Sequence, residues 1–172
     1  MADLIAGTGA TANSYTTADE ADIYFEKRLH TSVWDNADPD DKDKALMWAT
    51  RLLDEMVKWK GLQVDSYNQL RWPRYGVFNQ DDEELSSLDI PQFLKDATAE
   101  FAMHLLAADR TLETNRDLTG FKSVQVDVIK IEMNSGAGGS ANASKPIMPK
   151  SVWSIIKFYG SMYGRQLTLV RA

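Results

Sequence analysis

The stretch that decides the fold is residues 39–61, which read PDDKDKALMWATRLLDEMVKWKG. Its apolar side chains recur at the i, i+3, i+4, i+7 spacing of one helix face. Asp38 is placed to cap this helix, and Pro39 is placed at its first position, where the missing N–H is not needed. Because Gly61 then ends the pattern, the sequence predicts a helix from Pro39 to Lys60. Its apolar positions are Ala45, Leu46, Trp48, Ala49, Leu52, Leu53, Met56 and Val57.

Further elements are expected on both sides of this helix. A capping-box pattern, TADE, opens a short helix over residues 17–29, and apolar stripes predict helices over 90–112 and 149–160. Alternating Val and Ile over residues 123–133 predict a strand with a bulge where the alternation changes phase. We therefore expect a mainly α fold, a small bundle of about four helices with a short β-strand or hairpin and an extended C-terminal tail.

Composition and the predicted elements together divide the chain into three parts. Residues 1–15 are small and polar and are expected to form a flexible N-terminal arm. Residues 16–120 are expected to form the helical bundle domain. Residues 121–172 are expected to hold the β-segment, a Gly-rich linker over 135–144, the short helix and a docking tail.

Charge is unevenly distributed along the chain. The 172 residues carry 19 Lys and Arg against 25 Asp and Glu, a net charge of −6, and no Cys. Residues 1–117 hold 12 basic and 23 acidic side chains, whereas residues 118–172 hold 7 and 2. This asymmetry indicates two surfaces with different partners.

The lack of Cys excludes a disulfide scaffold, a thiol nucleophile and an iron–sulfur cluster. Neither a spanning apolar run nor a secretory signal is seen, so we expect an intracellular chain that contacts no membrane.

Catalytic motifs are sparse. His30 and His104 stand alone on different predicted helices, and no serine lies in a GxSxG turn. Gly136 to Gly139 lack the Lys and Ser or Thr of a phosphate loop. The acidic run 35–43 does not have EF-hand spacing, although a divalent-metal hydrolase remains an alternative. We expect no catalytic, cofactor-binding or metal-binding residues, and therefore no enzyme and no cofactor.

A cluster of cations and aromatics lies at Arg71, Trp72, Arg74 and Tyr75. Such sets can stack on and clamp single-stranded nucleic acid. The competing interpretation is that Trp72 packs onto the helical core while the two arginines pair with the many acids. The net negative charge of the first 117 residues favours this second interpretation, because it repels phosphates.

The order of several landmarks resembles a known family. Ala12-Asn-Ser-Tyr15 precedes the first helix, Trp59-Lys-Gly61 follows the long one, and the motif Trp72-Pro73-Arg74 is followed by Ile90-Pro91. This order, over residues 12–110, is similar to the small head-to-tail adaptor (head completion or connector) proteins of tailed phages. Some members of that family are labelled DnaT-like single-stranded DNA-binding proteins.

The resemblance implies a structural protein of a phage virion. It implies a homo-oligomeric, dodecameric ring below the portal protein that extends the DNA channel and connects the head to tail or nozzle proteins. DNA would pass through this ring without specific binding. The expected location is the neck between capsid and tail, with host cytoplasm during assembly.

The C-terminal tail is the expected contact with the portal and with neighbouring subunits, because its alternating apolar side chains suit strand addition or insertion into a groove. The expected interface residues are Trp153, Arg165, Leu167, Leu169, Val170 and Arg171. The alternative function is a single-stranded nucleic-acid-binding accessory protein for DNA replication, which would use the Arg71–Tyr75 cluster and the basic C-terminal third.

Overall fold

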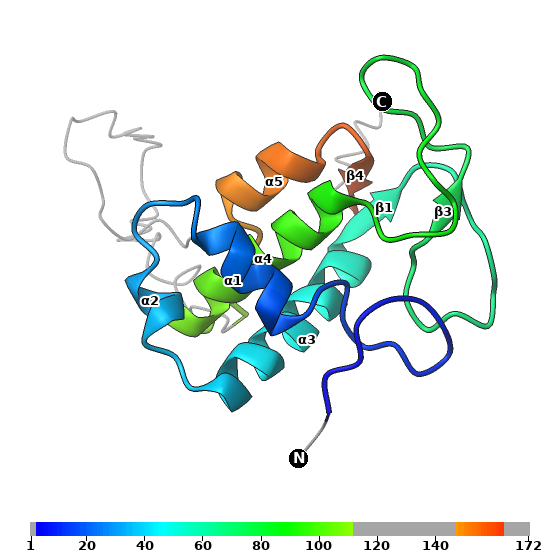
Figure 1. The fold of residues 1–172 in the computed structure, drawn as a ribbon. Helices are drawn as coiled ribbons and strands as arrows, with labels where there is room; N and C mark the ends of the chain where they lie inside the picture. The colour runs from blue at the N-terminus through cyan, green and yellow to red at the C-terminus, as the bar shows by residue number, and fades with distance from the viewer. Residues whose placement is uncertain (1–2, 112–146, 164–172) are drawn as a thin grey trace, which may run out of the picture.

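The computed structural model describes residues 3–111 and 147–163 (Figure 1). Its first helix, α1 (Ala18–Phe25), begins with the predicted capping box. The Thr17 hydroxyl accepts from the Glu20 N–H at 3.1 Å, and the Glu20 carboxylate accepts from the Thr17 N–H at 3.3 Å. A single turn, α2 (Ser32–Asp35), which the sequence did not predict, follows and buries Trp34.

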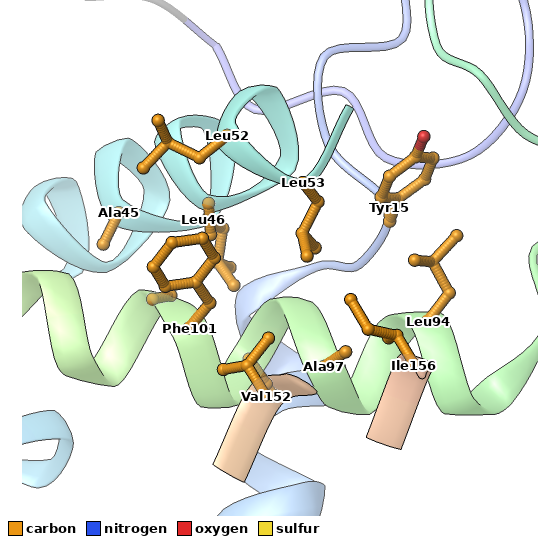
Figure 2. Packing of buried hydrophobic residues seen from close by; sticks show 14 of the residues in the cluster. Tyr15, Ala45, Leu46, Leu52, Leu53, Leu94, Ala97, Phe101, Val152 and Ile156 are labelled. Carbon is orange, nitrogen blue, oxygen red and sulfur yellow. The ribbon is translucent and has the colours of Figure 1, made fainter. Parts of the chain in front are cut away.

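Three helices enclose the core. The long α3 (Pro39–Met56) and α5 (Lys150–Ile156) both pack on α4 (Gln92–Ala107), which runs between them (Figure 1). Figure 2 shows their apolar faces meeting, with Tyr15 at one end. Of the stripe predicted on α3, only Trp48 is exposed and Met56 half-buried, so the 3.6-residue period was a sound guide to this face. The labelled core residues are Tyr15, Ala45, Leu46, Leu52, Leu53, Leu94, Ala97, Phe101, Val152 and Ile156.

The prediction of a mainly helical bundle is wrong. The described residues also form two antiparallel two-stranded sheets, so the fold is mixed α and β. One sheet pairs β1 (Val57–Trp59) with β4 (Gly160–Met162), and the other pairs β2 (Leu62–Gln63) with β3 (Arg74–Tyr75).

The long helix ends four residues before the predicted boundary because Val57 takes extended dihedral angles, φ −114° and ψ 123°. From there the chain alternates, with Val57 and Trp59 buried and Lys58 exposed, which is the period of a strand. The turn after β1 is Gly61, at φ +68°. Gly61 therefore ends a strand and not the helix.

The end of α5 is tied to the core by an aromatic stack and a close strand approach. The ring of Tyr159 stacks on Phe93 of α4 at 3.7 Å between centroids. Gly160 then begins β4 against β1, where an added Cβ would lie 2.5 Å from the Val57 side chain. The contact explains why a residue without a side chain stands there.

The segment expected to be an arm contributes to the core from residue 12 onward, since Ala12 and Tyr15 are buried. The predicted strand 123–133, the linker 135–144 and the tail 165–172 lie outside the described residues. No helix within the described parts is long and apolar enough to cross a membrane.

Candidate nucleic-acid interface

Trp72 is part of the core. Its side chain is fully buried, and its ring packs edge-on against Trp59 and Phe93, at centroid distances of 5.7 and 5.6 Å. A base cannot stack on a ring that has no exposed face. The interpretation of Trp72 as a packing residue is therefore confirmed, and its use as a stacking platform is not possible in this fold.

Arg74 holds the neighbouring backbone together. Its guanidinium donates to three carbonyl oxygens, those of Lys60 at 2.7 Å, Gly61 at 2.6 Å and Arg71 at 3.0 Å. Burial lowers the pKa of Arg74. The expectation that this arginine pairs with acids is therefore wrong, because carbonyl oxygens satisfy it instead.

The remaining members of the predicted motif are also structural. Pro73 and Ile90 are buried, and Pro91 occupies the position directly before the first residue of α4. Trp153 is half-buried on α5 and packs against the core. The other expected interface residues, Arg165, Leu167, Leu169, Val170 and Arg171, lie outside the described residues.

Asp54 joins four parts of the chain beside this motif. Its carboxylate accepts from the Tyr15 hydroxyl at 2.5 Å, the Trp59 indole N–H at 3.2 Å and the Arg71 backbone N–H at 3.1 Å. Burial raises the pKa of Asp54, although these hydrogen bonds act in the opposite direction. The Asp54 carboxylate thus fixes the backbone of Arg71, while the Arg71 side chain stays exposed.

The sheet formed by β1 and β4 (Figure 1) carries a surface with cations and aromatics. Because successive side chains on a strand alternate, Lys58 and Lys60 point away from the core that holds Val57 and Trp59. The Lys60 ammonium lies 4.5 Å from the centre of the Phe158 ring. We call this surface the β1–β4 face, and it comprises Lys58, Lys60, Phe158, Ser161 and Tyr163.

The strand register fixes the position of Ser161 on the face, and a backbone hydrogen bond fixes that of Tyr163. Ser161 lies opposite Lys58 in the strand register. Tyr163 follows β4, donates its backbone N–H to the Met56 carbonyl at 2.9 Å, and is 61% exposed. The backbone of Tyr163 is thus held in place while its ring is open to solvent.

Positive charge on this face is not neutralised within the described chain. Lys58 and Lys60, and the neighbouring Lys157, form no ion pair with a carboxylate of residues 3–111 or 147–163. Exposed acids lie at α2 and the start of α3, on the opposite side of the molecule from β1 and β4 (Figure 1), and also in the loop over residues 81–84. Ion pairs of lysine and arginine in the described parts of the chain include Arg28–Glu100, Lys42–Asp22, Lys44–Asp41, Arg51–Glu55 and Lys95–Glu20.

A serine, a histidine and a glutamate also meet, on α4 and α5. Nε2 of His104 lies 3.0 Å from the Ser151 hydroxyl and 3.5 Å from Glu100 Oε1. A catalytic triad needs the carboxylate on one ring nitrogen and the serine on the other, whereas here both face the same atom. The described residues also hold no group of three or more side chains placed to bind a metal ion.

The β1–β4 face is not among the sites predicted from the sequence. The overlooked signal is the alternation Val57-Lys58-Trp59-Lys60, which is strand-like but was included in the preceding helix. Phe158 and Tyr163 come about a hundred residues later, and no local pattern links them to it.

Comparison with known proteins gives one result. No curated protein and no solved structure matches this chain. A family model described as "Putative DnaT-like ssDNA binding protein" matches residues 4–172, which is nearly the whole length. The chain therefore belongs to the DnaT-like ssDNA-binding protein family.

Proposed function

We propose that the protein binds single-stranded DNA through the β1–β4 face and performs no catalysis on it. The observation that carries the proposal is the arrangement of Lys58 and Lys60 beside the exposed rings of Phe158 and Tyr163. The family to which the chain belongs supports the choice of single-stranded DNA as the ligand.

The two kinds of side chain have separate tasks in this proposal. Lys58 and Lys60 neutralise backbone phosphates, which releases counterions and makes binding salt-dependent. Phe158 and Tyr163 offer ring surface on which bases stack, an interaction that tolerates any sequence. Paired bases in a duplex do not expose these surfaces, so single strands are favoured.

Exposed acids on the surface limit where a DNA strand can approach the protein. Exposed carboxylates around α2 and the start of α3 repel phosphates. A strand would therefore approach the β1–β4 face and avoid α2, the start of α3 and the exposed acidic loop 81–84, even though the chain as a whole has a net charge of −6.

A titration at low salt tests the proposal. Fluorescence anisotropy of a labelled strand of about 20 nucleotides, longer than the usual site of one small domain, would be measured with wild type and with Lys58→Glu/Lys60→Glu. We expect the double variant to lose at least tenfold in affinity and to flatten the salt dependence. The slope of log K against log salt should fall by about 1.4, since each lost phosphate contact on a single strand contributes about 0.7.

The matched control changes two other exposed lysines away from the face. Lys27→Glu/Lys150→Glu alters the net charge by the same amount and should retain most of the affinity and the slope. Equal losses in both variants would contradict a localised interface.

A head-to-tail adaptor in a phage virion is the second candidate. Its support is the order of landmarks over residues 12–110, together with the uneven charge of the sequence, which is acidic over residues 1–117 and basic over 118–172. An acidic body suits a ring whose lining lets DNA pass. In that case the partners are a portal protein, tail proteins and further copies of this chain, and the protein resides in the virion neck. Negative-stain images of a portal mixed with this protein should show an added ring, and deletion of residues 165–172 should abolish it.

A further inference from the structure

A groove of about 620 Å³ opens beside the β1–β4 face, between α3 and the loop that precedes Trp72. Tyr163 lines it and also belongs to the face, so the two are continuous. The volume lies in the range of about 300–1,000 Å³ that small-molecule sites occupy. The face alone, as proposed above, assigns no role to this groove.

The walls combine apolar surface with hydrogen-bonding groups. Met47 is half-buried and Leu70 is buried, which gives the groove an apolar floor. Gln69 and Arg71 are exposed at its edge and offer an amide and a guanidinium. A planar heterocycle with a polar edge matches such a lining better than an aliphatic or a purely charged ligand does.

Charge in the groove is balanced, in contrast to the face. Two cations, Arg51 and Arg71, stand against two acids, Asp54 and Glu55. Arg51 pairs with Glu55 at 2.7 Å, and Asp54 already accepts three hydrogen bonds. The groove therefore lacks the excess positive charge that would draw a phosphate, and an uncharged ligand suits it.

We propose that this groove holds one unstacked nucleobase of the strand that the β1–β4 face binds, an inference that rests on the function proposed above. The base lies against Met47 and Leu70 with the Tyr163 ring beside it. Gln69 and the guanidinium of Arg71 hydrogen-bond its edge. The sugar-phosphate chain stays outside, on Lys58 and Lys60.

The experiment compares two strands of equal length, one with bases and one abasic throughout, in anisotropy titrations. Gln69→Trp fills the groove from an exposed position, and Gln80→Trp places the same ring on another exposed loop as the control. We expect Gln69→Trp to weaken binding of the base-bearing strand about tenfold, the effect of losing one stacked base, and to leave the abasic strand unaffected. Gln80→Trp should change neither.

The outcomes separate the two proposals. Failure of the wild type to bind either strand overturns both the function and the groove. Binding of the base-bearing strand that Gln69→Trp leaves unchanged overturns the groove alone. A second measurement uses the wild type, so that it does not depend on the folding of a variant. Adenosine, which has no phosphate, should shift the NMR signal of the Met47 methyl group, and an unchanged signal at millimolar adenosine contradicts the inference.

Discussion

The ammonium group of Lys60 lies 4.5 Å from the centre of the Phe158 ring. One residue follows β1 and the other precedes β4, so the contact joins segments almost a hundred positions apart. It places a cation and an aromatic surface side by side at the same edge of the small sheet. The pair is the centre of the proposed contact with single-stranded DNA.

Phe158→Ala should weaken binding of single-stranded DNA by about tenfold or more, because one stacked base contributes about 1–3 kcal/mol. The matched control is Phe78→Ala, which removes a somewhat more exposed ring from another loop. Anisotropy titrations of both variants measure the effect. Equal affinities for the two would show that Phe158 contributes no stacking.

Asp54→Ala should destabilise the fold by about 2–3 kcal/mol, because the part-buried Tyr15 hydroxyl and Trp59 indole N–H, together with the exposed Arg71 backbone N–H, lose their acceptor. Glu55→Ala, one residue further on, removes only a solvent-exposed ion pair with Arg51 and should leave stability almost unchanged. Urea denaturation of both variants gives the comparison. A loss for Asp54→Ala as small as that for Glu55→Ala would mean that the network is not a structural hub.

Gly61→Ala should be more damaging than Gly76→Ala. Both glycines have positive φ, at 68° and 70°, so both substitutions carry the strain of about 1–2 kcal/mol that a left-handed residue imposes. At Gly61 the new Cβ would also collide with the Tyr75 carbonyl oxygen, whereas at Gly76 no atom beyond the adjacent residues lies within 4 Å of it. In thermal denaturation, the melting temperature of Gly61→Ala should therefore lie several degrees below that of Gly76→Ala. Identical melting temperatures would contradict the close approach of β3 to the turn.

Stability should rise with pH between about pH 5 and pH 7. Burial lowers the pKa of His104, and the nearby Arg110 and Arg28 add to this while Glu100 opposes it. The folded protein thus binds fewer protons at His104 than the unfolded chain does at pH values up to about 6.5. Acidification through that range favours unfolding. Urea denaturation at several pH values in this range gives the free energy of unfolding as a function of pH. Its slope against pH should be smaller for His104→Gln than for wild type, and an unchanged slope would assign the pH dependence to other groups.

The helices were accessible to sequence analysis because their signals are local. The capping box at Thr17 and the apolar stripe on α3 each lie within one segment, and both appear in the structure. The strands were not accessible, because β1 to β4 span two or three residues each and carry too few positions for a period.

The candidate site depends even more on the tertiary fold. Lys58 and Lys60 were placed on a helix, and only the pairing of β1 with β4 brings Phe158 and Tyr163 to them. The aromatic that the sequence made conspicuous, Trp72, is a core residue, since neighbouring cations do not reveal whether a ring is buried. Composition identified the residue types of the interface but not their positions.

The most direct test of the account is a map of backbone amide shifts on addition of single-stranded DNA to the isotope-labelled protein. Binding through the β1–β4 face predicts the largest shifts at Lys58, Lys60, Ser161 and Tyr163, with little change at α2 and the start of α3. Absence of shifts on the β1–β4 face, or larger shifts at α2 and the start of α3, would contradict binding through that face.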